Sequence, residues 1–382
     1  MRLRLRVTSR RGEANPEAGI NWATYAQPPK EPISNDEEEE DRLKAAVFYS
    51  RSDIRLNDLP VPKIGPGELL VKMHTVGLCG TDVTKIVNES VKPGTVLGHE
   101  LTGTVAEVGQ GVTGFVHGQR VVTLHHVPCQ ACWYCQHGDY SMCHGFKTSN
   151  FDPGGFADYV RIPAANVKYG TFALPDHTSF DAATFTEPLA CCLRVPQRSG
   201  WQAGDRVMVV GAGPVGLLLA QCAKLYLAHT WVTDMVDDRL TLAREFGIDE
   251  ALNPSVDDVE ARVRQITGGV GLDGVILTAS GQPVWDQAMR LVRDGGFIHL
   301  FAVKAGGAPT TVDLNEVLVR QIQVMSTYSS TPIAARESLD LISRGLIKVE
   351  ELISHRLSLA DLGHAVDMAV RREGRKIMIE SD

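Results

Sequence analysis

The junction between an apolar run at residues 207–210 and the sequence GAGPVG at residues 211–216 constrains the fold most. A run without polar residues is typical of a strand buried in a parallel sheet. In the G-x-G-x-x-G spacing, the first glycine makes the tight turn, the second lets the backbone approach a pyrophosphate, and the third lets helix and strand pack closely. The N-terminal amides of the helix would hold that anion. The junction therefore predicts a dinucleotide-binding βαβ unit.

A carboxylate ends the next predicted strand, which covers residues 230–233. Asp234 lies 23 residues after Gly211, where a carboxylate would bond the adenosine ribose hydroxyls. It would repel a 2′-phosphate, so the sequence favours NAD over NADP. Arg239 is close enough along the chain to leave NADP open.

Before and after this unit the chain changes character. At 382 residues it is too long for one ordinary core, which predicts two packed units. Short β-type runs separated by Gly and Pro predict a barrel-like β domain, and they lie at 69–73, 103–108 and 119–124. Strands alternating with helices then predict a doubly wound sheet, with strands at 206–210, 230–233, 274–278 and 296–301 and helices at 217–227 and 240–246. After residue 326 we expect a helix, a strand at 354–357, a helix at 359–371 and a strand at 376–379.

The charge balance and the ends of the chain argue against some classes of protein. Asp and Glu number 46 against 38 Lys and Arg, which argues against a nucleic-acid-binding protein. The sequence has no run of about 18 apolar residues, so it predicts no membrane span. Residues 1–42 begin with five Arg within eleven residues and continue to an acidic run at 36–41, without an apolar signal segment. We interpret them as a disordered tail; a mitochondrial transit peptide and a misplaced start codon are the alternatives.

Four cysteines gather within 15 residues at Cys129, Cys132, Cys135 and Cys143. Four thiolates are the ligand set of a tetrahedral structural zinc. Iron–sulfur proteins begin with similar spacing but place the fourth cysteine after three residues, whereas here the gap is seven. Because such a set closes the coordination sphere, we predict a structural and not a catalytic metal.

A second candidate metal site lies in the β domain. Cys79, His99 and Glu100 would give zinc three ligands and leave the fourth position open for water or substrate. Each residue alone has an ordinary explanation, as a core cysteine, a turn histidine and a solvent carboxylate. Their occurrence together with the glycine turn and the four-cysteine set favours a catalytic zinc.

Five motifs in this order carry a family resemblance. They are GLCGTD (77–82), GHE (98–100), CxxCxxCx7C (129–143), TEPLAC (186–191) and GAGPVG (211–216). From about residue 44 to 378 the chain resembles the zinc-dependent medium-chain alcohol dehydrogenases, most of all their polyol branch, with the sorbitol (L-iditol) and threonine dehydrogenase-like members.

The resemblance implies an α/β protein with a GroES-like β-barrel catalytic domain and a Rossmann domain with a doubly wound parallel sheet, assembled as a homodimer or homotetramer. The predicted parts are the tail (1–42), the catalytic domain with its zinc lobe at 129–143 (43–192), the NAD-binding Rossmann domain (193–326) and a segment completing the catalytic domain (327–382).

Residue roles also follow from the resemblance. Cys79, His99 and Glu100 match the catalytic-zinc positions, while Glu187 matches a carboxylate that binds the metal directly or through water in some relatives, so the third ligand stays open. Asp82 matches a carboxylate that orients His99, and Thr81 a proton-relay hydroxyl. The matching cofactor positions are Gly211, Gly213, Val215, Gly216, Asp234 and Arg239.

Two departures from the family pattern concern the substrate. Threonine dehydrogenases have a histidine where this chain has Thr84, which argues against threonine as the substrate. Sorbitol dehydrogenases have an Arg-Tyr pair where this chain has Thr327 and Tyr328, so the tyrosine alone is kept. We expect Tyr328 and Phe146 to contact the substrate.

The predicted function is zinc-dependent, reversible, NAD-linked oxidation of a secondary alcohol on a polyol, cyclitol or sugar-like substrate to a ketone. The alternatives are an NAD(P)-dependent reductase or simple secondary-alcohol dehydrogenase of the same superfamily, and a nucleotide-sensing module without turnover. Of the eight cysteines, Cys191, Cys192 and Cys222 lie in apolar surroundings and predict ordinary packing. The other five would be thiolate ligands, which favours a reducing, cytoplasmic location.

Overall fold

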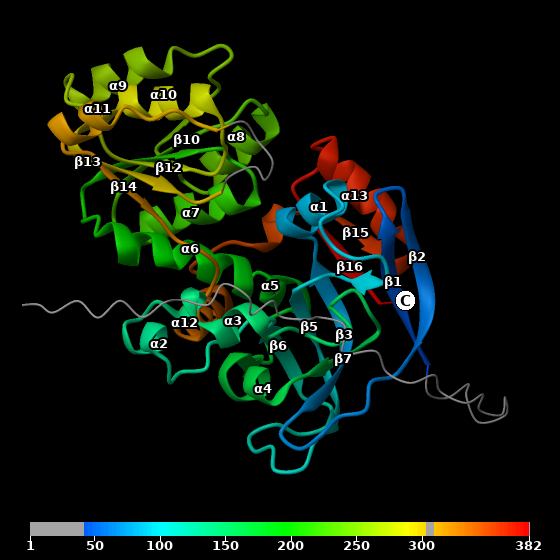
Figure 1. The fold of residues 1–382 in the computed structure, drawn as a ribbon. Coiled ribbons are helices and arrows are strands. Elements are labelled where there is room, and N and C mark those ends of the chain that lie inside the picture. The colour runs from blue at the N-terminus through cyan, green and yellow to red at the C-terminus, as the bar shows by residue number, and fades with distance from the viewer. Residues whose placement is uncertain (1–41, 303–308, 382) are drawn as a thin grey trace, which may run out of the picture. The chain divides into compact units, whose positions relative to one another are not determined.

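Two large sheets organise the chain in the computed structural model, which describes residues 42–302 and 309–381 (Figure 1). The predicted tail lies outside the described residues, except that Arg42 begins the first strand. Contacts group residues 41–382 into a single unit, so the predicted boundaries at 192 and 326 stay predictions.

A seven-stranded sheet and a three-stranded sheet form the β-rich part. The larger sheet has the order β15-β16-β3-β5-β6-β8, with β7 paired to β3, and the smaller has the order β2-β1-β4. Their strands are β1 (Arg42–Ser50), β2 (Asp53–Pro60), β3 (Leu69–Gly77), β4 (Thr95–Val96), β5 (Glu100–Val108), β6 (Arg120–Leu124), β7 (Tyr159–Ile162), β8 (Thr171–Ala173), β15 (Ile353–Ser358) and β16 (Lys376–Glu380). The last two strands come from the C-terminal end of the chain, where β15 pairs with β16 and β16 pairs with β3.

Helices connect and cover these strands. They are α1 (Gly80–Val87), α2 (Trp133–Gln136), α3 (His144–Thr148), α4 (Ala164–Gly170), α5 (Phe180–Thr184), α6 (Thr186–Ser199), α12 (Pro332–Ser343) and α13 (Leu362–Val370), with short 3₁₀ helices at Tyr140–Met142, Glu350–Leu352 and Leu359–Asp361. The longest of them, α6, ends where Gly200 takes a left-handed conformation at φ 65°. Such a residue is the common stop signal of a helix.

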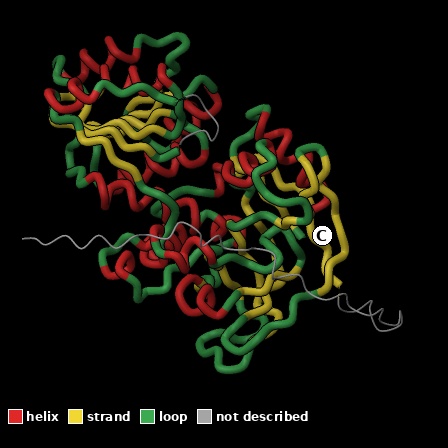
Figure 2. The backbone as a smooth tube through the Cα atoms, viewed as in Figure 1, coloured by secondary structure: helices red, strands yellow, loops and turns green. Residues whose placement is uncertain are grey.

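The second large sheet has six parallel strands in the order β11-β10-β9-β12-β13-β14. Its elements are β9 (Arg206–Val210), α7 (Pro214–Leu225), β10 (His229–Thr233), α8 (Asp237–Glu245), β11 (Glu250–Leu252), α9 (Val259–Thr267), β12 (Leu272–Leu277), α10 (Gln282–Leu291), β13 (Val292–Leu300), α11 (Leu314–Val319) and β14 (Gln323–Ser326). Helices flank this sheet on both faces (Figure 2). The order is that of the Rossmann fold, so the predicted fold class is confirmed.

Alternate residues of β9 show why an apolar run folds this way. Val207 and Val209 pack into one core, whereas Met208 and Val210 pack into another. Because successive side chains of a strand point to opposite faces, a strand with a core on each side needs apolar residues at every position. A separate core lies in the β-rich part, between strands such as β1, β3 and β5. No helix of the described residues has the length and apolar character of a membrane span.

Candidate active site

The glycine turn lies where β9 ends and α7 begins. Gly211 has φ 103°, and a Cβ there would lie 2.4 Å from Oγ1 of Thr278. A Cβ on Gly216 would lie 1.8 Å from the carbonyl oxygen of Gly211. Side chains are therefore excluded at both positions. Gly213 caps α7 and Pro214 follows at its first position, which leaves the N-terminal amides of a 12-residue helix free to bind an anion.

Asp234 supports the same turn from the end of β10. Its carboxylate accepts hydrogen bonds from the backbone N–H of Ala212 at 2.8 Å and of Val236 at 3.0 Å. The guanidinium of Arg239 lies 3.3 Å from the carboxylate. The acidic residue and the arginine predicted at the cofactor are thus one ion pair beside the glycine turn, with Val215 following in α7.

Cys79 is held at the start of α1, directly after β3. It caps the helix, and its Sγ accepts a hydrogen bond from the backbone N–H of Thr81 at 3.4 Å. The carboxylate of Asp82 accepts one from the backbone N–H of Cys79, also at 3.4 Å. The helix start therefore fixes a half-buried thiol next to a buried carboxylate.

His99 reaches the same place from the residue before β5. Its Nδ1 lies 3.2 Å from Oδ1 of Asp82, and both side chains are buried. Burial acts to lower the pKa of His99 and to raise that of Asp82, but their mutual attraction outweighs burial, so the pKa of His99 lies well above and that of Asp82 below its usual value. Because Asp82 occupies Nδ1, Nε2 is the ring atom available to a metal.

Glu100 begins β5 and completes the set. One ligand atom each from Cys79, His99 and Glu100 lies within 4.8 Å of the others. Thiolate, imidazole and carboxylate with a free fourth position are a donor set that fits a catalytic zinc. Burial raises the pKa of Glu100, Lys376 opposes this, and Glu187 adds to it through like charge.

Glu187 lies near this set but outside the group of ligand atoms that the 4.8 Å spacing defines. It occupies the first turn of α6 and is 6% exposed. The thiol of Cys191, one helical turn later, donates to its Oε1 at 3.4 Å. Glu187 is therefore held by its own helix, and its contact with the metal stays a prediction.

The four-cysteine lobe brings its thiols together as the spacing predicts. Cys129, Cys132, Cys135 and Cys143 have Sγ atoms within 4.8 Å of one another. Burial opposes ionisation of Cys143, but backbone N–H groups of Cys129 and Phe146 lower the pKa of its thiol to about 6. The core of the lobe consists of Cys135, Cys143 and Phe146. So small a core fits a segment that a metal stabilises.

Three other predicted site residues lie in different settings. Thr81 is exposed in the first turn of α1. Phe146 is 1% exposed, with its ring 5.3 Å from that of His126. Tyr328 is 64% exposed, and its carbonyl oxygen accepts a hydrogen bond from Arg194 of α6. The substrate contacts of Phe146 and Tyr328 stay predictions.

Sequence reasoning missed four side chains around this site. The ring of His125 lies 4.6 Å from that of His99 and 3.9 Å from that of His126. Lys376 bonds to Glu100, and Arg194 fixes the segment that carries Tyr328. The two adjacent histidines after β6 could have been recognised in the sequence as candidate site residues. Lys376 and Arg194 belong to no local sequence pattern.

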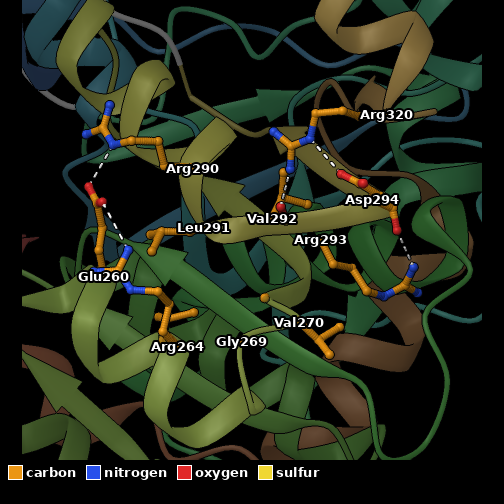
Figure 3. A pocket seen from close by; sticks show the side chains of 12 residues that line it. Glu260, Arg264, Gly269, Val270, Arg290, Leu291, Val292, Arg293, Asp294 and Arg320 are labelled. Atoms are coloured by element: carbon orange, nitrogen blue, oxygen red, sulfur yellow. Dashed lines mark hydrogen bonds and ion pairs between the residues drawn. The ribbon is translucent and has the colours of Figure 1, made fainter.

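A cavity of about 470 Å³ lies elsewhere, where β12 and β13 begin (Figure 3). The strands of this sheet are parallel, so the cavity lies at their N-terminal ends, whereas the glycine turn lies at their C-terminal ends. Its basic side chains pair with acids, among them Arg290 with Glu260 at 2.7 Å and Arg320 with Asp294 at 2.7 Å. The cavity is therefore lined by a network of ion pairs remote from the candidate active site.

Two family models match the chain. Residues 65–175 match the alcohol dehydrogenase GroES-like domain, and residues 214–344 match the zinc-binding dehydrogenase model. The first match covers both metal sets, and the second begins inside the glycine turn and continues through most of the six-stranded sheet.

Individual proteins are similar over most of the chain. It is 32% identical to D-arabitol-phosphate dehydrogenase of Enterococcus avium over 85% of this chain and 93% of the relative. It is also 32% identical to sorbitol dehydrogenase of Gallus gallus, over 88% and 96%. An NADP-bound structure of a Sinorhizobium meliloti protein, named as a zinc-binding dehydrogenase, superposes with a TM-score of 0.80 at 30% identity, covering 89% of this chain and 99% of that one.

Proposed function

Because the chain belongs to the polyol branch of the zinc-dependent medium-chain alcohol dehydrogenases, we propose that it oxidises a secondary alcohol of a polyol, cyclitol or sugar-like substrate to a ketone, with NAD accepting the hydride. The observation that carries this proposal is that Cys79 lies with the adjacent residues His99 and Glu100, about 20 residues later in the chain, in one group of potential ligands. Two relatives of this chain are named for sorbitol and arabitol phosphate, which supports a polyhydroxy substrate.

Zinc would be held by Cys79 Sγ, His99 Nε2 and a carboxylate, for which Glu100 is the nearest candidate. Zinc bound there supplies Lewis acidity that lowers the pKa of an alcohol hydroxyl. Asp82 keeps His99 in the tautomer with Nε2 free. The exposed hydroxyl of Thr81, two residues from Cys79, is placed to accept and pass on the proton. A second zinc would be held by the four cysteines at 129–143, which would fill its coordination sphere.

The cofactor proposal rests on Asp234. A carboxylate beside the glycine turn suits ribose hydroxyls and repels a 2′-phosphate, and Arg239 is already paired with it. NADP is the alternative, because a similar protein was solved with NADP. Initial rates with each nucleotide decide between them: we expect a higher kcat/KM with NAD, and a preference for NADP would reject this assignment.

For assembly and location we propose a homodimer or homotetramer in the cytoplasm. Strand β14 lies at the end of the six-stranded sheet, and Leu314, Leu318 and Val319 of α11 are about three-quarters exposed. Exposed apolar groups of this kind mark interaction surfaces. All eight cysteines are free thiols, which suits a reducing compartment.

Substitution of one ligand tests the function. We expect Cys79→Ala to abolish NAD-linked oxidation in a panel of polyols, cyclitols, sugars and simple secondary alcohols, and to lower the zinc content from two ions per chain to one. Cys222→Ala is the matched control, because Cys222 is buried in a core away from both metal sets. Undiminished oxidation by Cys79→Ala, or a wild-type protein without zinc, would reject the proposal.

A further inference from the structure

Helix α6 has one stripe of side chains that leads away from the candidate zinc site. Of residues 186–196, only Cys191 and Arg194 are not buried. Together with Glu187 and Arg198 they follow one another at intervals of three or four residues, which places all four side chains on one face of the helix. Arg194 comes seven residues after Glu187, which is about 10 Å along the helix axis. The stripe therefore has a carboxylate near the metal set at one end and two guanidinium groups at the other.

Arg194 is a half-buried cation that forms no ion pair among the described residues. Its Nη1 donates hydrogen bonds to the carbonyl oxygens of Tyr328 at 2.6 Å and of Ser329 at 2.8 Å, which are its only hydrogen bonds within that part of the chain. Burial lowers the pKa of Arg194 below its usual value, the thiol of Cys191 opposes this, and the charge of Arg198 adds to it. Because a guanidinium stays protonated in proteins, a cation without a compensating anion is left here.

The surroundings of Arg194 add to the positive charge. Arg198 is 55% exposed, and its ion pair with Asp139 is 3.7 Å long. His299 is buried, and burial together with the charges of Arg198 and Arg194 lowers its pKa to about 4. His299 is therefore neutral at pH 7 because positive charge lies close to it. This positive region belongs to a chain whose net charge is −8.

The free edge of the Arg194 guanidinium selects the kind of group that it can bind. Since Nη1 is engaged with backbone carbonyls, the edge formed by Nε and Nη2 remains. That edge presents two parallel N–H groups, which is the geometry that binds two oxygens of a carboxylate or a phosphate. A half-buried guanidinium binds such a group more strongly than an exposed one, because the solvent screens their attraction less.

We propose that Arg194 binds an oxyanion, a phosphate or a carboxylate, at the end of the substrate remote from the reacting alcohol. The reacting alcohol belongs at the zinc set, so the anionic group lies at the other end of the stripe on α6. Arg198 adds attraction without a defined contact, because it is exposed. This inference rests on the proposed function and narrows its substrate class from polyhydroxy compounds in general to those that carry an anion.

A panel of matched substrates tests the inference and separates the two oxyanions. Each set contains a neutral polyol, its terminal phosphate ester and the aldonic acid of the same chain length; sorbitol, sorbitol 6-phosphate and gluconate form one set, and the arabitol series forms another. With zinc-loaded wild-type protein and NAD, we expect an anionic member to exceed its neutral parent in kcat/KM by about 10-fold or more. The ester or the acid that gains more identifies the oxyanion. If no anionic member of any set exceeds its neutral parent, the inference is overturned.

Variants of Arg194 then separate substrate binding from a structural role. In Arg194→Met, the loss of kcat/KM for the anionic member should exceed the loss for its neutral parent by about 10-fold or more, mainly through KM. Arg194→Lys keeps the charge without the two parallel N–H groups, so its preference should lie between those of wild type and Arg194→Met. A side chain that only fixed the backbone of residues 328–329 would affect both substrates equally, so equal losses would overturn the inference.

Controls keep the test decisive. Arg344→Met, which removes another arginine and its ion pair with Asp340 on α12, should leave the preference for the anionic member unchanged. If Arg194→Met does not fold, Arg194→Lys serves alone, and an undiminished preference in that variant would overturn the inference. A protein that oxidises neutral and anionic members equally well keeps the proposed function and loses only this inference. Undiminished oxidation by Cys79→Ala rejects the proposed function itself.

Discussion

The carboxylate of Asp82 decides which ring nitrogen His99 offers to a metal. Asp82 is completely buried and contacts both the His99 ring and the backbone of Cys79. Groups that orient a metal ligand typically contribute 10- to 100-fold to metal affinity. We therefore predict that Asp82→Asn weakens binding of the catalytic zinc by about 10- to 100-fold, measured by chelator competition. The exposed Asp176→Asn should leave affinity unchanged, and equal affinity in both variants would contradict the orienting role.

Asp273 gives a pH-dependent prediction away from the metal sites. Burial acts to raise the pKa of its carboxyl, but the backbone N–H and guanidinium of Arg206 and the guanidinium of Arg293 outweigh burial and lower it. A carboxyl whose pKa is lower in the folded protein than in the unfolded one stabilises the folded state at pH values above its unfolded-state pKa, which is about 4 for Asp. This stabilisation is lost as the pH falls through the folded-state pKa.

Asp273→Asn should therefore lower the free energy of unfolding by about 1–3 kcal/mol at pH 7. The difference from wild type should shrink as the pH falls below about 4. Urea titrations across this range measure it. A constant difference at every pH would show that the loss comes from packing and not from the charge of Asp273.

Which site residues the sequence could reveal depended on how far apart they lie along the chain. Cys129 to Cys143 and the glycine turn each occupy one short segment. The spacing of the ligands and the backbone positions that require glycine can therefore be inferred from the sequence alone. His99 and Glu100 were predicted from their adjacent positions in the GHE motif. Lys376 pairs with Glu100 across 276 residues. Only the pairing of β16 with β3 and of β3 with β5 brings them together, and no local pattern encodes it.

At the scale of elements, the cysteine lobe has little regular structure and only a small core of its own. Its helices have four and five residues, and only Cys135, Cys143 and Phe146 form its core. Helices this short are not stable alone. We predict that removing the zinc from the four cysteines makes the backbone amides of residues 129–148 exchange rapidly with D₂O, while those of β9 and β12 stay protected.

Hydrogen exchange followed by mass spectrometry makes this comparison in a single sample. Cys135→Ser should reproduce the effect without a chelator, and Cys192→Ser, at a buried cysteine outside the lobe, is its control. Continued protection of residues 129–148 after the zinc is lost would mean that packing alone holds the lobe.

Elements were easiest to predict where one local rule dominates. The strand predicted at 206–210 is β9, because a two-sided core demands an uninterrupted apolar run. Ends were harder: the strand expected at 296–301 begins at Val292 in β13. Arg293 and Asp294 interrupt the apolar pattern at the start of β13. Their charges are paired there, because Arg293 forms an ion pair with Asp273 and Asp294 forms one with Arg320.

At the scale of the whole molecule, one end of the six-stranded sheet remains unpaired among the described residues. Strand β14 pairs with β13 on one side only, and α11 beside it exposes Leu314, Leu318 and Val319 by 74%, 75% and 79%. An unprotected edge strand invites pairing with another chain, and apolar side chains next to it add area to bury. In the proposed homodimer or homotetramer, a second copy of this chain would supply both partners at once.

Leu318→Glu places a charge in the proposed contact and should dissociate the proposed assembly, because a carboxylate buried without a partner costs several kcal/mol. Light scattering after size exclusion should report a mass that falls to a smaller multiple of the 41.6 kDa of one chain. Val256→Glu, at an 80% exposed loop residue, should leave the mass unchanged. Because Cys79, His99 and Glu100 come from the other sheet and its helix α1, the dissociated variant should keep its full zinc content. A Leu318→Glu protein with the wild-type mass would place the interface elsewhere.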